Sequence, residues 1–500
     1  MTGPRDRMAL RLLAIVLAAT VIGGCGKARP LVPAAAAGPA PEVAALQREL
    51  AALLDRPGLR RATWGIAVRS LRTGERLFER TPHALLVPAS AMKVVTAAVA
   101  GAAVGWDFTF TTTVELAGTL DGGTLNGDLV LRGSGDPATL GEGGTDLAGA
   151  VRDALNERGI TRIAGRVIGD DNLVEEPRPG LAWSWDDLGT TSGAVSGALN
   201  ATENVTRIVV KPGPAPGQPS TVEPPVDDPG MLIVNHSTTG AAGTPQTLWA
   251  ERRPGEAGLA IEGSLPHEAR PVFLTVSVGN PTLWTARLVR SRLIAAGVVV
   301  DGDAADADDL PDAPTTGERL VTVLSRPLAD VVTPMLKRSI NMYAEALLRL
   351  ATGREGARET QAAVAATRRY LREWGVSEDA ARMVDGSALS RWNLMSAETL
   401  VAVLAHERDG ANASPLLASL PVAGVDGTLA ERMKGTPAAG NVRAKTGAMN
   451  GVRSLAGYVT TQDGEPLAFA VVVNNYEGAA SVAVAAIDAL AVRLAGFSRR

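Results

Sequence analysis

Three short motifs, separated by long stretches of chain, constrain this sequence more than any other feature. They are Ser90-Ala91-Met92-Lys93, Ser339-Ile340-Asn341 and Lys445-Thr446-Gly447. An S-x-x-K tetrad places a hydroxyl and an amine on one face of a helical turn, where the amine can take the proton of the hydroxyl. Each motif alone can arise by chance, so their joint presence in this order is what predicts serine acyl transfer.

The residues around the tetrad predict a nucleophile at the start of a buried helix. The run from Ser90 to Val99 follows a proline and is rich in alanine and other apolar residues. Backbone N–H groups at the start of that helix, with the N–H of Ala448 as a second donor, would face the oxyanion formed on attack. Apolar surroundings should lower the pKa of Lys93 and keep its amine neutral, and Lys445 nearby would lower that pKa further.

The second and third motifs predict groups that handle the proton and the substrate. Ser339 and Asn341 lie between two helical segments, where they would relay the proton to the leaving amine and hydrogen-bond the substrate amide. Lys445 and Thr446, on a predicted strand, would hold a terminal carboxylate, and Gly447 would let the substrate backbone approach closely. The inferred substrate is a peptide with an anionic end.

The first 45 residues predict export. A basic start and an apolar run from Leu12 to Ile22, too short to span a bilayer, precede Gly23-Gly24-Cys25. This resembles a bacterial lipoprotein signal, so we expect a signal peptide over residues 1–24, lipid on Cys25, and a membrane-anchored protein on the extracytoplasmic side of the cell envelope. An ordinary cleaved signal with an incidental cysteine is the alternative. Residues 25–45, rich in Ala and Pro, would form a linker.

Composition and motif searches exclude several classes of function. The formal net charge of -4 and the 4% aromatic content, without interleaved basic and aromatic residues, predict no nucleic-acid partner. The four histidines show no zinc-ligand spacing, and no G-x-S-x-G elbow is present. The acidic stretch from Asp301 to Asp312 lacks the ligand spacing of a calcium loop. We therefore expect no metal and no cofactor.

The middle of the chain differs from its ends. Between residues 111 and 315, short Val, Ile and Leu segments are punctuated by Gly, Pro and Asp, which predicts β-rich inserted material. Before it, residues 64–78 predict a hairpin. After it, residues 328–350 predict a helix with a polar break, and residues 442–494 predict three antiparallel strands and a closing helix.

The three motifs in this order resemble those of penicillin-binding proteins and serine β-lactamases. The long separation of Ser90 from Ser339 exceeds the compact β-lactamase layout. This separation and three further segments carry the resemblance. By them, residues 45–496 are similar to the class C low-molecular-mass penicillin-binding proteins, the D-alanyl-D-alanine carboxypeptidase/endopeptidases of peptidase family S13. These segments are Gly133-Ser134-Gly135-Asp136-Pro137, Asn341-Met342-Tyr343-Ala344-Glu345 and Asp385-Gly386-Ser387-Ala388-Leu389-Ser390.

The resemblance implies a fold, a domain plan and an activity. The fold is an α/β (α+β) serine β-lactamase/DD-peptidase-like catalytic domain, split by two mainly β inserted domains. Residues 46–110 and 316–500 would form the catalytic domain, and residues 111–315 the inserted domains. The implied activity is cleavage of peptidoglycan stem peptides and their cross-links through an acyl-enzyme on Ser90, with β-lactams as covalent inhibitors.

The resemblance also implies roles for individual residues. The family uses an inserted-domain aspartate to read the amino end of the stem peptide; Asp170 is the expected match, and Asp171 is nearly as plausible. By motif, the other matches are Lys93 as general base, Ser339 and Asn341 as the second motif, and Lys445, Thr446 and Gly447 as the carboxylate-binding strand.

Two positions depart from the family pattern. Ala388 stands where the family has glycine, which would strain the turn if that residue needs a positive φ. Ala448-Met449 follows the K-T-G motif where a hydroxyl residue is common. Neither change removes a catalytic group, so both concern rate and specificity.

Two other functions are compatible with these motifs. A β-lactamase or esterase on the same catalytic fold would need an efficient deacylating water, and no well-supported Glu is evident for that role. A weakly catalytic, wall-binding lipoprotein would keep the fold for recognition alone. The three intact motifs argue against this last alternative.

Overall fold

The computed structural model describes residues 39–228, 230–253, 256, 258–409 and 413–500. The predicted signal peptide (1–24), Cys25 and the linker as far as residue 38 lie outside the described residues. Helix α1 (Pro41–Leu54) begins inside the linker expected over residues 25–45, because buried leucines one helical turn apart attach it to the core. Within the described ranges, no helix is long and apolar enough to cross a membrane.

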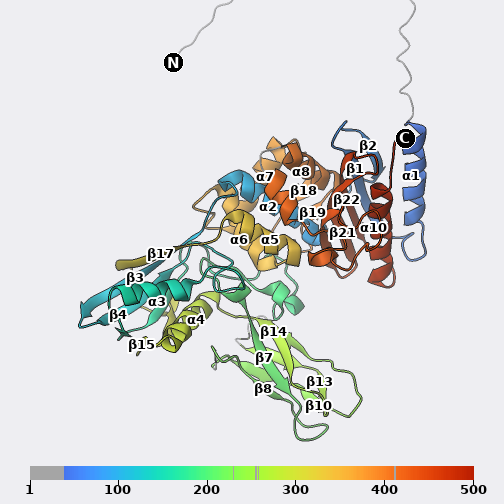
Figure 1. Cartoon of the computed structure of the whole chain (residues 1–500). Helices are drawn as coiled ribbons and strands as arrows, with labels where there is room; N and C mark the ends of the chain where they lie inside the picture. Colours follow the sequence, from blue (N-terminus) through green and yellow to red (C-terminus); the bar gives the residue numbers. More distant parts are fainter. Residues whose placement is uncertain (1–38, 229, 254–255, 257, 410–412) are drawn as a thin grey trace, which may run out of the picture. The chain divides into compact units, whose positions relative to one another are not determined.

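A five-stranded antiparallel sheet joins the two ends of the folded chain (Figure 1). Its order is β2-β1-β22-β21-β20, so the N-terminal hairpin pairs directly with a strand near the C-terminus. The predicted hairpin and the three predicted C-terminal strands are all confirmed. The strands are β1 (Thr63–Ser70), β2 (Arg76–Arg80), β20 (Arg443–Met449), β21 (Val452–Thr460) and β22 (Pro466–Asn474).

Both faces of this sheet are buried, and β22 shows how the sequence specifies them. The bulky side chains of Leu467 and Phe469 face one side, where they pack in one core with α1 and the closing helix α10 (Ala480–Ala495). The small side chains of Ala468 and Ala470 face the other side, toward a group of helices. Small residues on that face let these helices, which carry two of the motifs, pack close to the sheet.

The helical part of this domain surrounds α2 (Lys93–Val104), an alanine-rich helix almost all of whose residues are buried. Because α2 has no polar face, it forms the centre of a core instead of its surface. The predicted break within residues 328–350 is confirmed between α5 and α6. The surrounding elements are α5 (Leu328–Arg338), α6 (Asn341–Arg349), α7 (Thr360–Glu373), α8 (Ala397–Asp409), α9 (Ala413–Ser419), β18 (Ala381–Arg382) and β19 (Leu394–Met395).

The inserted segment has two parts, each with its own hydrophobic core. The first is a mixed sheet that shares its core with two helices, so it contains more helix than the sequence predicted. Its elements are β3 (Thr111–Asp121), β4 (Thr124–Arg132), α3 (Leu147–Glu157), β5 (Arg162–Ile163), β6 (Val167–Asp170), α4 (Pro281–Ala295), β15 (Val299–Val300), β16 (Ala304–Asp306) and β17 (Glu318–Leu324).

The second part is built from short strands, as predicted for β-rich material. They are β7 (Val205–Lys211), β8 (Thr221–Glu223), β9 (Ile233–Asn235), β10 (Thr238–Gly240), β11 (Trp249–Glu251), β12 (Leu259–Glu262), β13 (Ser264–Pro266) and β14 (Val272–Ser277). At the other boundary, β17 pairs with β3 and so extends the inserted sheet beyond residue 315, its predicted end. We propose that the catalytic domain resumes at α5.

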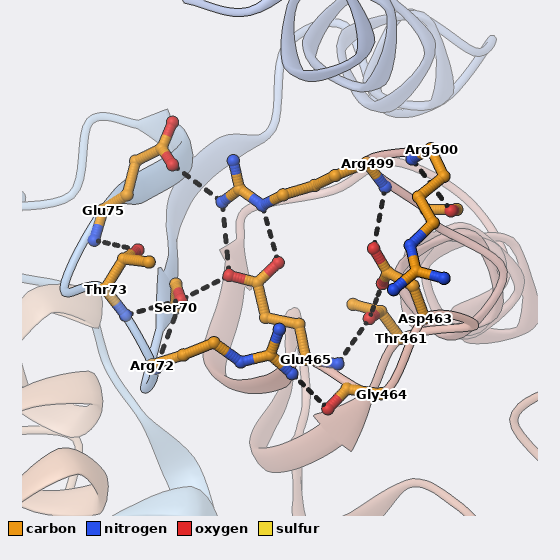
Figure 2. Close-up of polar contacts among 11 residues, drawn as sticks. Ser70, Arg72, Thr73, Glu75, Thr461, Asp463, Gly464, Glu465, Arg499 and Arg500 are labelled. Carbon is orange, nitrogen blue, oxygen red and sulfur yellow. Dashed lines mark hydrogen bonds and ion pairs between the residues drawn. The ribbon is translucent and has the colours of Figure 1, made fainter.

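A group of mostly charged side chains ties the C-terminal end of the chain to the strand ends at one end of the sheet (Figure 2). Arg499 donates to the carboxylate of Glu465 from Nε at 2.7 Å, and from Nη2 to Glu75 at 2.7 Å. Glu465 is 1% exposed and also accepts a hydrogen bond from the hydroxyl of Ser70. These four residues form the C-terminal clasp, in which a buried carboxylate is met by donors from separate segments.

Candidate active site

Ser90 lies in a single 3₁₀ turn (Ala89–Met92) that leads directly into α2. The nucleophile is therefore at the start of a buried helix, as predicted, although the α-helix itself begins at Lys93. Ala89 adopts a φ of +45°, a strained conformation for a residue with a Cβ. This turn leaves Ser90 partly exposed, while the next residue on the same face, Lys93, is fully buried.

The amine of Lys93 contacts three oxygen atoms. Its Nζ lies 2.7 Å from Ser90 Oγ, 2.6 Å from Asn341 Oδ1 and 3.0 Å from the Ser387 carbonyl oxygen. A neutral amine has two N–H bonds, and the Asn341 and Ser387 oxygens can only accept them. The remaining lone pair therefore faces the Ser90 hydroxyl, which can donate its proton to the amine. This geometry suits a lysine that acts as a general base on serine.

Burial gives Lys93 a protonation state suited to that role. Loss of solvent lowers the pKa of Lys93 from 10.5 to about 7, while the charges of Glu345 and Asp385 act in the opposite direction. Burial also lowers the pKa of Lys445 well below its usual value, and the charge of Lys93 lowers it further. Desolvation is thus the first cause for Lys93, as expected, but its main charged neighbours are carboxylates and not Lys445.

The second motif lies in the tight turn between α5 and α6. Ser339 ends α5 with a φ of +64°, and its hydroxyl accepts a hydrogen bond from Lys445 Nζ at 2.9 Å. Asn341 begins α6, and its Nδ2 donates to the Ser192 carbonyl at 2.9 Å, which leaves Oδ1 to face Lys93. Since Ser192 belongs to the inserted segment, the insert sets the orientation of a side chain that contacts the base.

The third motif lies on β20, an edge strand beside the turn that carries Ser90. Lys445 Nζ also donates to the Thr446 carbonyl at 2.7 Å, and Thr446 Oγ1 donates to Thr428 Oγ1 at 2.7 Å. A Cβ on Gly447 would lie only 2.8 Å from the Pro88 carbonyl oxygen. We expected this glycine to make room for substrate; the structure shows that it lets β20 pack closely against the nucleophile turn.

A buried carboxylate from α6 supports the loop that contacts the base. Glu345 accepts hydrogen bonds from the backbone N–H of Gly386 at 3.1 Å and of Ser387 at 2.8 Å. It thereby holds the Ser387 carbonyl, which faces Lys93. The sequence indicated Glu345 only as part of a family motif, because its partners are far away in the chain.

A second buried carboxylate organises the same loop and links it to the insert. Asp385 accepts from the backbone N–H of Ala388 and of Ser390, each at 2.8 Å, and from the indole of Trp183 at 3.0 Å. Ala388 has a φ of +62°, so the turn does need a positive φ and the methyl group at this position is strained. Trp183 comes from the inserted segment and was not singled out by sequence.

A cleft of about 1190 Å³ opens at these motifs. Its walls come from both the catalytic domain and the inserted segment, which explains why no single stretch of sequence predicts its shape. Catalytic-domain residues that line it include Ser90, Ser339, Asn341, Thr446 and Ala448, and inserted residues include Asp186, Asp187, Glu203, Arg207 and Thr275.

Asp170, the residue expected to read the amino end of the substrate, is not among the residues that line this cleft. Its carboxylate pairs with Arg132 on the neighbouring strand β4. Asp171 is buried and accepts a hydrogen bond from Thr282 Oγ1 at 2.6 Å. We did not predict from the sequence that Asp186 and Asp187 line the cleft. The only signal was a short stretch with two tryptophans and two aspartates at residues 183–187.

In the part of the chain that the structure describes, one group of carboxylates has oxygen atoms close enough to share a metal ion. It consists of Asp171, Asp306 and Asp308. Each already accepts a hydrogen bond from a protein donor, namely Thr282, Asn280 and Asn172 respectively. None of these carboxylates lines the cleft, so the group is separate from the three motifs.

Comparisons with known proteins agree with this architecture. The sequence model of the D-Ala-D-Ala carboxypeptidase 3 (S13) family matches residues 46–495. The D-alanyl-D-alanine carboxypeptidase of Actinomadura sp. (strain R39) is 35% identical and covers 95% of this chain and 92% of its own. The D-alanyl-D-alanine carboxypeptidase DacB of Haemophilus influenzae is 28% identical, over 82% of this chain and 85% of its own.

Solved structures show the same fold. The crystal structure of penicillin binding protein 4 (dacB) from Haemophilus influenzae has a TM-score of 0.73 at 27% identity, and covers 86% of this chain and 94% of that one. A structure of that protein complexed with a β-lactam has a TM-score of 0.70 at 25% identity, with 89% and 98% covered. The predicted catalytic fold, with its inserted domains, is confirmed.

Proposed function

Since this chain belongs to the D-Ala-D-Ala carboxypeptidase 3 (S13) family and is a serine-type D-Ala-D-Ala carboxypeptidase, we propose that its acyl-enzyme forms on Ser90. The observation that carries this assignment is the set of three contacts made by Lys93, which direct its lone pair at the Ser90 hydroxyl. Lys93 is the general base in this proposal.

Acylation begins when neutral Lys93 takes the proton of Ser90 and Oγ attacks the carbonyl carbon of the penultimate D-Ala. The oxyanion that forms is stabilised by the backbone N–H groups of Ser90 and Ala448. The C–N bond then breaks, and the proton passes from Lys93 to the leaving amine with Ser339 as the relay. Water later attacks the ester, gives a proton back to Ser90 Oγ, and releases the shortened peptide.

The leaving D-Ala is held by the third motif in this proposal. Thr446 lines the cleft and can offer a hydroxyl to the terminal carboxylate. Lys445 is buried beside it, in contact with Ser339 and the Thr446 carbonyl, and can offer a charge. An anion bound there would restore positive charge to Lys445, because it opposes the loss of solvent that lowers its pKa. Carboxylate binding and protonation of Lys445 are therefore coupled.

The substrates proposed are peptidoglycan stem peptides and their cross-links. The cleft extends from Ser90 to Asp186 and Asp187 of the inserted segment, and these acids replace Asp170 as candidates for the amino end of the stem peptide. A cleft with walls from two domains suits endopeptidase action on a cross-link as well as removal of a terminal D-Ala. The β-lactam complex of the Haemophilus influenzae relative supports acylation of Ser90 by β-lactams.

We also propose that the enzyme works in the cell envelope, anchored by lipid on Cys25. The support is the basic start, the short apolar run and the Gly23-Gly24-Cys25 sequence. Expression with Cys25→Ser should move the protein from the membrane fraction to the soluble fraction after cell breakage. Unchanged membrane association would contradict the anchor.

Labelling with a fluorescent penicillin, combined with release of D-Ala from a short acyl-D-Ala-D-Ala peptide, tests the catalytic proposal. The wild type should label stably and release D-Ala, and Ser90→Ala should do neither. Ser377→Ala changes an exposed serine that does not line the cleft and serves as the matched control. Rapid turnover of the penicillin would favour a β-lactamase, and continued labelling of Ser90→Ala would exclude Ser90 as the nucleophile.

A further inference from the structure

One exposed face of the inserted segment continues the cleft outward. Strands β14, β7 and β8 form a three-stranded antiparallel sheet with β7 at its centre. Side chains on its inner face, such as Ile208 and Val276, are buried in a hydrophobic core. Because side chains alternate along a strand, the residues between them face outward. Four of these outward residues, which we call the outer strip, are Arg207, Val209, Phe273 and Thr275.

The outer strip begins at the cleft and runs away from it. Arg207 lies directly opposite Thr275 in the register, and both line the cleft. Val209 lies opposite Phe273, one step farther along the same face, and neither of these lines the cleft. A ligand that fills the cleft can therefore continue onto Val209 and Phe273 without crossing another element of this sheet.

Two side chains of the outer strip are available to a ligand. Phe273 is 64% exposed, although a phenylalanine normally gains stability from burial. Arg207 is also exposed, and no described carboxylate pairs with it, whereas Arg338 of the same cleft is paired with Glu203 at 2.6 Å. An exposed aromatic ring beside an unpaired guanidinium is typical of a binding surface.

We propose that the outer strip binds the glycan chain of peptidoglycan next to the stem peptide held in the cleft, an inference that rests on the proposed function. The C–H face of a sugar ring can stack on Phe273 and remove apolar surface from water. Arg207 supplies charge and donors for the carboxylates and hydroxyls along such a chain. A peptide that adds to a sheet docks along a free strand edge, whereas Val209 and Phe273 face outward from the surface of the sheet and would be contacted by a ligand that lies across it.

Pull-down on bead-immobilised, peptide-free glycan strands tests this surface in the Ser90→Ala background, which removes cleavage. We expect Phe273→Ala and Arg207→Gln each to weaken binding about fivefold, as fits the loss of one aromatic or charged contact. Leu120→Ala and Arg319→Gln alter exposed residues on the other inserted sheet and are the matched controls. Both controls should bind like the Ser90→Ala parent.

The same substitution in the active enzyme separates the surface from the chemistry. Phe273→Ala should leave D-Ala release from the short peptide within about twofold, and should slow its release from insoluble peptidoglycan about fivefold. Equal glycan binding by Phe273→Ala and its parent would overturn the proposal. Binding to intact peptidoglycan without any binding to peptide-free glycan would also overturn it, because the occupant would then be peptide. A wild type that releases no D-Ala from the short peptide would contradict the proposed function instead.

Discussion

Two groups of buried ionisable side chains in this enzyme differ in whether oppositely charged groups contact each other. Lys93 and Lys445 are fully buried, and within the described ranges their amines contact only hydroxyl, amide and carbonyl oxygens. In the C-terminal clasp, buried Glu465 meets the guanidinium of Arg499 directly (Figure 2). Pairing stabilises the charged form of Glu465, whereas neutral partners leave the lysines with lowered pKa values. The ion pairs of the clasp therefore suit stability, and the buried lysines without ionic partners suit catalysis.

Replacing the buried base should give the largest effect. Lys93→Met removes the amine that takes the Ser90 proton, so we expect acylation by penicillin to slow by about 10³-fold or more. Thermal stability should stay the same or rise, because an apolar chain of similar size replaces a buried amine that has no ionic partner. Stopped-flow labelling and thermal unfolding measure the two effects. Lys434→Met, at an exposed lysine, is the control.

Breaking the clasp should have the opposite outcome, which is a loss of stability without a loss of acylation rate. Glu465→Gln leaves Arg499 without its buried counter-charge, so the free energy of unfolding should fall by about 3 kcal/mol. The acylation rate should not change, since the clasp lies outside the cleft. Glu431→Gln breaks an exposed pair with Lys434 and should change stability by less than about 1 kcal/mol. A slower acylation in Glu465→Gln would mean that the two groups are coupled.

The pH dependence should also separate the two groups. With the pKa of Lys93 near 7, acylation at pH 6 should be about tenfold slower than on the plateau above pH 8. This lowered pKa means that the unfolded chain binds more protons between about pH 7 and 10.5, so this group makes stability rise with pH there.

Glu465 should act at low pH, where it too makes stability rise with pH. Burial opposes its ionisation, but hydrogen bonds from Arg499 and Ser70 hold the pKa of Glu465 below its usual value. Its contribution is present above the unfolded pKa of 4.5 and is lost as the pH falls through the folded value. Denaturant unfolding from pH 3 to 10 in the wild type and Glu465→Gln checks both signs. An equal loss of unfolding free energy at low pH in both proteins would contradict the assignment of Glu465 to the clasp.

An ion pair between the insert and α5 can be used to test whether the insert positions the second motif. Glu203, with a φ of +61°, pairs through both oxygens with Arg338, the residue before Ser339. Glu203→Ala should slow acylation about fivefold with little loss of stability, because Arg338 is half exposed. Arg338→Ala should have the same effect, and the double variant should be no slower than either single one. Additive losses would indicate that each residue acts separately.

The smallest effect should come from a turn in the loop beside Lys93. Ala388→Gly removes a methyl group at a φ of +62°, so the free energy of unfolding should rise by about 1 kcal/mol or less. Ala402→Gly, in the regular helix α8, should lower it by a similar amount. Denaturant titration measures both. Loss of stability in Ala388→Gly would mean that the methyl group packs well enough to outweigh its strain.

Much of the catalytic domain could be predicted from the sequence because its signals are local. The alternation in residues 64–78 and 466–474 predicted strands, and the polar break before Asn341 predicted the turn between α5 and α6. The first insert was harder, because the amphipathic helix α3 lies among short strands and glycines. The predicted end of the insert, residue 315, lies before β17, because β17 joins the inserted sheet only through its pairing with the distant strand β3.

The sequence by itself determined which residues could form a serine and lysine pair, because three positions along a helix place Ser90 and Lys93 on one face. It also indicated that Lys93 would be buried. Only the tertiary structure decided what surrounds that pair: the Ser192 carbonyl that orients Asn341, and the turn that occupies the space beside Gly447. Those contacts join residues more than a hundred positions apart. Strand register and domain packing, which no local pattern records, bring them together.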